Sequence, residues 1–65
     1  MKLRINGEEV ETSATTVQEL AESLTPAPAT LLIEHNLKAL LRSEWTETHL
    51  AEGDKIEVLR VSAGG

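Results

Sequence analysis

Few side chains in this sequence could do chemistry by themselves. The imidazoles are limited to His35 and His49, and there is no cysteine. Ser–His–Asp catalysis needs a nucleophile, a base and an orienting acid that converge, and the spacing of these two histidines indicates no such triad. Two isolated histidines also fall short of the usual zinc ligand sets, and no carboxylates have the spacing of a calcium loop. We therefore expect neither a catalytic residue nor a metal site.

The end of the sequence, Ser62-Ala63-Gly64-Gly65, is more suggestive. Small residues that finish on two glycines make a thin tail, which can enter a narrow site on another protein. The carboxylate of Gly65 is unreactive until it is activated, for example as an acyl adenylate, and a thiol or persulfide then attacks the uncrowded glycyl carbonyl. No glycine-rich loop precedes a helix to hold ATP phosphates, so a partner would supply the activation. A frayed tail without function is the alternative interpretation.

The composition predicts one small acidic domain. Sixty-five residues leave room for a single thin core, and six Lys and Arg against eleven Asp and Glu give a net charge of −5. This charge has the wrong sign for nucleic acid, although it could steer the domain to a basic patch on a protein. No apolar stretch approaches the roughly 18 residues of a membrane span, and the N-terminus does not resemble a signal peptide. We expect a cytoplasmic protein without nucleic-acid or membrane partners.

The N-terminal segment predicts a β-hairpin. Apolar and polar residues alternate over residues 1–6, which is the pattern of a strand with one buried face. Asn6-Gly7 then predicts a type I′ turn, because these residue types tolerate positive φ. The returning strand is expected over residues 8–12, with Val10 pointing inward.

A capping box predicts a helix that begins after Thr16. The Thr16 hydroxyl can accept a hydrogen bond from the Glu19 amide, and the Glu19 carboxylate can reach back to the cap. Apolar residues follow at helical spacing and are expected to face the core: Val17, Leu20, Ala21 and Leu24. Pro26 and Pro28 end the helix because neither can continue the hydrogen-bond ladder.

The second half predicts three more strands. Residues 30–35 form an apolar run of strand length, Asn36 provides a turn, and a short strand follows near residues 38–41. The segment 42–50 is expected to be irregular, with Trp45 as its aromatic anchor in the core.

Residues 55–61 are expected to form the last strand after a turn at residues 52–54. The alternation of the strand puts Ile56 on the inner face, together with Val58, and leaves Leu59 and Val61 on the other face. The order of elements is typical of an α+β fold, in which one helix packs across a single sheet.

Several segments together resemble a known family. They are Lys2–Glu8, Ile33–Asn36, Arg42–Trp45, Glu52–Val58 and the terminal Ala63-Gly64-Gly65. The chain resembles the ubiquitin-like sulfur carriers of the ThiS/MoaD group, and within it the ThiS family of thiamine biosynthesis. Two residues depart from the ThiS pattern: Leu37 stands where a glycine commonly follows the asparagine, and Leu41 where a proline commonly precedes the arginine. These departures concern the turn geometry of the middle hairpin.

The resemblance implies a β-grasp domain over residues 1–61, with a five-stranded mixed sheet around one helix and parallel first and last strands, followed by a flexible tail over residues 62–65. It also implies a carrier rather than an enzyme. A ThiF-like enzyme would use ATP to adenylate the C-terminal carboxylate, the carrier itself binding no cofactor. Sulfur mobilised by a cysteine desulfurase would convert the adenylate to a thiocarboxylate, which would donate sulfur to thiazole synthase.

Residue by residue, the resemblance assigns the sulfur to Gly65 and access to the partner's site to Gly64 and Ala63. Leu59 and Val61 would form a docking patch, or they could simply be buried under a neighbouring loop. Three other functions stay open: a MoaD-like carrier for molybdopterin or another thiolation pathway, a β-grasp interaction module whose Gly-Gly is incidental, and a modifier conjugated to lysines.

Overall fold

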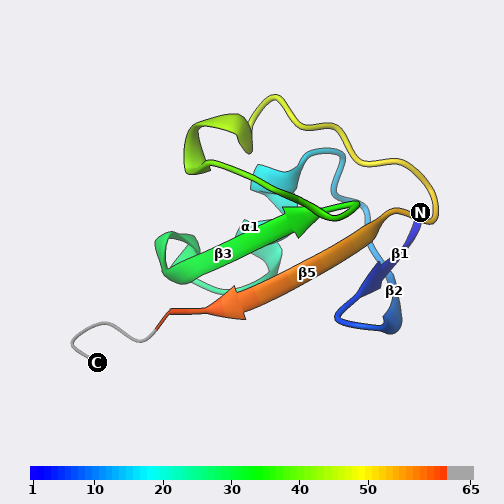
Figure 1. The fold of residues 1–65 in the computed structure, drawn as a ribbon. Coiled ribbons are helices and arrows are strands. Elements are labelled where there is room, and N and C mark those ends of the chain that lie inside the picture. The colour runs from blue at the N-terminus through cyan, green and yellow to red at the C-terminus, as the bar shows by residue number, and fades with distance from the viewer. Residues whose placement is uncertain (62–65) are drawn as a thin grey trace.

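A computed structural model describes residues 1–61 and shows one five-stranded sheet with one main helix (Figure 1). The strands lie in the order β2-β1-β5-β3-β4, where β1 and β5 are parallel and the other neighbours antiparallel. Their bounds are β1 (Lys2–Ile5), β2 (Glu8–Glu11), β3 (Leu31–His35), β4 (Lys38–Ala39) and β5 (Lys55–Arg60). This is the β-grasp arrangement, and the expected fold class is confirmed.

The first hairpin forms as its sequence predicts. Asn6 and Gly7 have φ angles of 50° and 85°, the positive values that a type I′ turn requires. The Asn6 side chain also continues the pairing of β1 with β5, because its Oδ1 accepts from the Val58 amide at 2.8 Å and its Nδ2 donates to the Val58 carbonyl at 3.1 Å. The turn is therefore tied to the last strand as well as to its own hairpin.

Helix α1 (Val17–Leu24) begins at the predicted cap, with one difference. The Thr16 hydroxyl accepts from the Glu19 amide at 3.2 Å as expected, but the Glu19 carboxylate accepts from the amide and hydroxyl of Thr15, one residue before the cap. These two bonds from Thr15 hold the pKa of Glu19 below its ordinary value. The cap is thus extended by one residue compared with the predicted capping box.

The segment after β4 completes the N-terminus of α1. The amides of Val17 and Gln18 have no partner inside the helix, and they donate to the carbonyls of Thr48 and Trp45 at 3.0 and 3.1 Å. Trp45 itself is fully buried, which confirms it as the aromatic anchor of the core. A short 3-10 turn, η2 (Arg42–Glu44), precedes it in the segment that was expected to be irregular.

The core lies between α1 and one face of the sheet, which we call the inner face. Its buried apolar residues come from every part of the domain: Leu3, Ile5, Ala14, Val17, Leu20, Ala21, Leu31, Ile33, Trp45, Leu50 and Ile56. Val10 is partly buried against this cluster, as predicted. The prediction for Leu24 was wrong: it is 40% exposed, because it is the last residue of the helix.

Four strands have boundaries that differ from the predicted ones. β2 ends at Glu11, one residue before the predicted end. β3 begins at Leu31 because residues 28–30 form a 3-10 turn, η1 (Pro28–Thr30). β4 ends at Ala39 rather than Leu41, whose amide donates instead to the Glu44 carboxylate at 2.8 Å and so opens η2. β5 ends at Arg60, one residue before the predicted end.

The middle hairpin repeats the turn of the first hairpin with a less suitable residue. Asn36 has a φ of 50° and Leu37 a φ of 72°, so a leucine occupies the left-handed conformation that Gly7 occupies in the first turn. A bulky residue with this φ is strained, because its Cβ crowds the backbone. Leu37 is also 84% exposed, and burial therefore does not offset the strain.

Replacing Leu37 with glycine should stabilise the domain. Relief of the left-handed strain exceeds the added freedom of the unfolded chain, so we expect the free energy of unfolding to rise by about 0.5–1 kcal/mol. Leu41→Gly is a matched control, since Leu41 is exposed but has an ordinary φ of −72°. This control should lose stability, and urea unfolding of the three proteins checks both signs. A Leu37→Gly variant no more stable than its parent would contradict the argument from strain.

Candidate functional site

Strand β5 leads to the tail that the sequence singles out. Of the predicted site, Ala63, Gly64 and Gly65 lie outside the described residues. Val61 is the last residue described, and its amide donates to the Thr30 carbonyl at 2.6 Å. This bond fixes the position at which the chain leaves the sheet beside η1, at the start of β3 (Figure 1).

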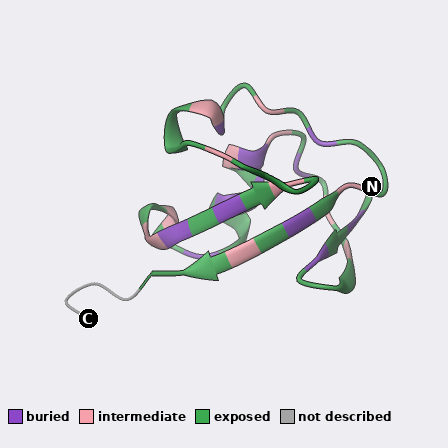
Figure 2. Ribbon diagram, viewed as in Figure 1, coloured by how far each residue is buried: buried purple, intermediate pink, exposed green. Residues whose placement is uncertain are grey.

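The two residues predicted to dock a partner are exposed. Successive side chains of β5 alternate between the inner face and the opposite, outer face, as the alternating colours of this strand show (Figure 2). Ile56 is fully buried on the inner face, whereas Leu59 on the outer face is 68% exposed. Val61, just beyond the strand, is 47% exposed. Both side chains are therefore available to a partner.

Leu32 belongs to the same apolar surface, and the sequence analysis missed it. It stands directly opposite Leu59 in the pairing of β3 with β5, and it is 58% exposed. The signal was present in the alternation of β3, because Leu31 and Ile33 both face the core and Leu32 must then face outward.

A groove of about 390 Å³ lies beside this leucine pair, where β3, β4 and β5 adjoin. We call it the sheet groove, and its lining residues are Leu32, Ile33, Glu34, Ala39, Leu40, Glu57 and Leu59. The groove combines apolar side chains with two carboxylates on the face that α1 leaves open.

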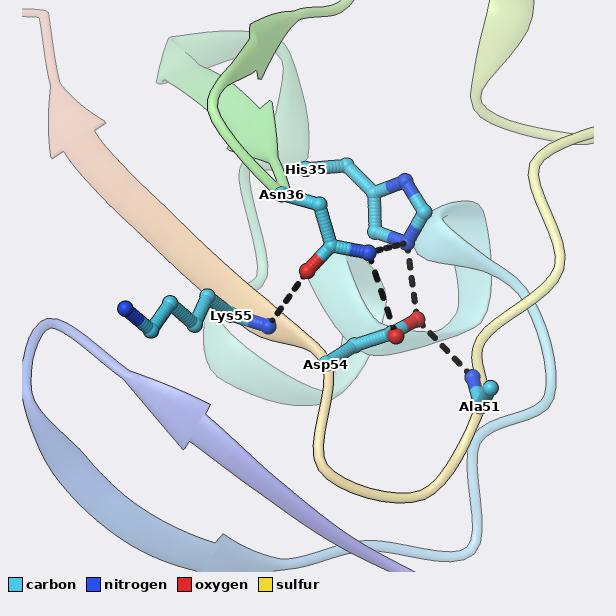
Figure 3. Close-up of polar contacts among 5 residues, drawn as sticks. All are labelled: His35, Asn36, Ala51, Asp54 and Lys55. Carbon is cyan, nitrogen blue, oxygen red and sulfur yellow. Dashed lines mark hydrogen bonds and ion pairs between the residues drawn. The ribbon is translucent and has the colours of Figure 1, made fainter.

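A polar cluster lies at the opposite end of β5 (Figure 3). Asp54 is at its centre: Oδ2 is 2.7 Å from His35 Nε2 and accepts from the Ala51 amide at 2.9 Å, while Oδ1 accepts from Asn36 Nδ2 at 3.2 Å. Asn36 Oδ1 in turn accepts from the Lys55 amide at 2.9 Å. The cluster therefore ties the middle hairpin to the turn before β5.

This cluster holds structure rather than performing catalysis. Burial alone would raise the pKa of Asp54, but the hydrogen bonds from His35, Ala51 and Asn36 outweigh it and hold the pKa below its ordinary value. No hydroxyl or thiol is bonded to His35 within residues 1–61, and His49 lies elsewhere, in a bridge with Thr16. The same residues contain no group of three or more potential metal ligands and no helix long and apolar enough to cross a membrane.

Comparison with known proteins agrees with this fold. The sequence model of the ThiS family matches residues 3–65. The crystal structure of the thiamine biosynthesis protein ThiS from Geobacter metallireducens superposes with a TM-score of 0.82 at 28% identity, covering all of both chains. A solution structure of a thiamine biosynthesis protein from the same organism gives 0.81 at 30% identity, covering all of this chain and 88% of the other.

A curated relative is longer. A thiazole synthase from Paramagnetospirillum magneticum is 36% identical over 66 residues, which is 100% of this chain and 20% of that protein. This chain thus spans about a fifth of the length of that relative. Taken together, the β-grasp fold and the match over residues 3–65 show that the chain belongs to the ThiS family.

The lowered pKa of Asp54 predicts a specific dependence of stability on pH. Because the folded state binds this proton less tightly than the unfolded state, the stabilisation is present above the ordinary pKa of about 3.9 and is lost as the pH falls through the lowered value. Asp54→Asn should therefore reduce the free energy of unfolding at pH 7 by roughly 1–2 kcal/mol, and the difference from the parent should shrink below about pH 4.

Denaturant unfolding from pH 7 to pH 2 measures both quantities. Glu47→Gln is the matched control, because it removes an exposed carboxylate that has no side-chain hydrogen bond within residues 1–61, and it should reduce the free energy of unfolding at pH 7 much less than Asp54→Asn does. If the free energies of unfolding of Asp54→Asn and the parent differed by a constant amount from pH 7 to pH 2, the lowered pKa of Asp54 would not explain the stabilisation.

Proposed function

We propose that this chain carries sulfur as a thiocarboxylate on Gly65 for the formation of the thiazole ring of thiamine. The observation that carries the proposal is the terminal Gly64-Gly65 on a chain that matches the ThiS family over residues 3–65. Two residues without side chains leave the terminal carbonyl open to attack, and they let the tail adopt whatever conformation a narrow partner site requires.

The chemistry is supplied by partners. A ThiF-like enzyme transfers AMP from ATP to the Gly65 carboxylate and releases pyrophosphate. Sulfur mobilised by a cysteine desulfurase arrives as a persulfide, whose terminal sulfur attacks the adenylate and displaces AMP. A second thiol then reduces the resulting acyl disulfide, which leaves the thiocarboxylate on Gly65 and a disulfide on the sulfur donor. A thiazole synthase receives the sulfur. The similarity of this chain to a segment of a thiazole synthase supports that acceptor, since a carrier domain and the enzyme that consumes its sulfur occur there in one protein.

The domain itself, residues 1–61, contributes recognition. We propose that Leu59 and Val61 dock the activating partner, together with Leu32, while residues 62–65 extend into its active site. Exposed apolar side chains on neighbouring strands are suited to this, because their burial against a partner releases water and requires no rearrangement of the sheet.

Incubation with a ThiF-like enzyme, ATP, a persulfide source and a thiol reductant should replace one carboxylate oxygen of Gly65 by sulfur. Intact-mass measurement detects this as the mass difference between sulfur and oxygen, and a chain without Gly65 should show no change. Subsequent incubation with thiazole synthase should return the original mass as thiazole phosphate forms. Sulfur transfer to molybdopterin synthesis instead of thiazole would overturn the assignment to thiamine, and isopeptide adducts on lysines would indicate a modifier.

A substitution in the tail should reduce activity without changing stability, whereas a substitution in the core should reduce stability. Gly64→Val adds a branched side chain where the tail must be thin, so we expect loss of adenylation with a change in the free energy of unfolding of no more than about 0.5 kcal/mol. Leu20→Ala is the contrasting variant: Leu20 is fully buried in the core cluster, and its truncation should cost about 2–5 kcal/mol. Equal adenylation rates for Gly64→Val and the parent would remove the argument for threading.

A further inference from the structure

Two glutamates on the outer face are paired in an unfavourable way. Glu34 of β3 and Glu57 of β5 stand directly opposite each other in the antiparallel pairing, and both are exposed. Like charges at directly opposite positions destabilise a sheet. Within residues 1–61 neither carboxylate forms an ion pair or a side-chain hydrogen bond. The isolated domain therefore gains nothing from this pair.

The pair lies beside the apolar surface that leads to the tail. On the outer face, Glu34 is the next side chain after Leu32 along β3, and Glu57 is the one before Leu59 along β5. The pair of carboxylates therefore lies directly beside the pair of leucines. All four side chains line the sheet groove. A partner that buries the leucines must therefore also cover the carboxylates and remove water from them.

Covering two carboxylates without a counter-charge would oppose binding, because an ionised group that loses water must be paired. A cationic side chain at this place would instead bind both carboxylates and remove their mutual repulsion. Arginine suits this arrangement better than lysine, because its planar guanidinium donates hydrogen bonds in a fork that matches carboxylate oxygens.

We propose that Glu34 and Glu57 select the activating partner by receiving a basic side chain, arginine or lysine, while Leu32 and Leu59 are buried beside it. This inference rests on the proposed function and names the chemistry of the partner surface: an apolar side chain flanked by at least one cation. A second copy of this chain fits less well, since each copy carries a net charge of −5 and two copies repel each other.

Two double variants test the role of these two charges in binding, and they are expected to have different effects on the melting temperature. Glu34→Gln with Glu57→Gln removes the repulsion, so its melting temperature should rise. Glu34→Lys with Glu57→Lys keeps a like-charge pair of opposite sign, so its melting temperature should stay near that of the parent. Weak binding by the lysine variant therefore cannot be attributed to unfolding.

Binding of the full-length chains to the ThiF-like enzyme is measured by calorimetry at low and at high salt. We expect the glutamine variant to bind on the order of tenfold more weakly at low salt and the lysine variant more weakly still. The difference in affinity between each variant and the parent should narrow at high salt, because salt screens the attraction that only the parent retains.

The double variant Glu8→Lys with Glu47→Lys is the matched control. Both glutamates are exposed and lie away from the sheet groove, and their replacement changes the net charge by the same amount as the groove lysine variant does. It should bind much more tightly than the groove lysine variant, and equal affinities of the two would overturn the proposal in favour of nonspecific charge steering. A parent dimer in sedimentation that the groove lysines dissociate would also overturn it, assigning the pair to self-association.

Failure of the parent chain to acquire sulfur would contradict the proposed function instead. The binding comparison does not depend on sulfur transfer, so the two failures can be distinguished.

Discussion

One helix can cover only one face of a five-stranded sheet, and this constraint determines how the rest of the domain is used. Helix α1 and the segment that carries Trp45 enclose the inner face, where Leu3 and Ile56 are fully buried. No further element remains to cover the outer face within residues 1–61. Apolar residues there, such as Leu32 and Leu59, consequently have no partner inside the domain, and the outer face is where the fold can contact another protein.

The parallel pairing of β1 with β5 places the last strand in the middle of the sheet. β5 is held on both sides, by β1 and by β3, and the Asn6 side chain adds two hydrogen bonds to Val58. A central strand is harder to displace than an edge strand, since both of its rows of backbone groups are paired. This two-sided pairing covers the first part of β5, up to Val58. The residues nearest the tail are held by β3 and by the bond from the Val61 amide to the Thr30 carbonyl.

Most elements with local signals could be predicted from the sequence, whereas features that depend on distant partners could not. Asn6-Gly7 and the Thr16 cap identified the first hairpin and α1, because turn and cap preferences act within a few residues. The early end of β4 is an exception, because its cause is local: the Leu41 amide donates to the Glu44 carboxylate three residues later instead of continuing the strand. Leu32 was missed because its importance comes from its pairing with Leu59, which is 27 positions away in the printed sequence. The Gly-Gly end was found from its residue types alone, and its role was inferred by resemblance.

Two unfavourable features of the described residues, the backbone strain at Leu37 and the pair of Glu34 with Glu57, have different explanations. The strain at Leu37 is held in place by its neighbour, because the Asn36 side chain bonds to Asp54 and to the Lys55 amide, and these bonds keep the turn in its left-handed form. The repulsion between Glu34 and Glu57 has no such compensation within the described part of the chain. A locally compensated strain is a property of the fold. An uncompensated charge pair beside an open apolar groove is instead explained by a group that lies outside the domain, which is the reason that we propose a partner cation at this position.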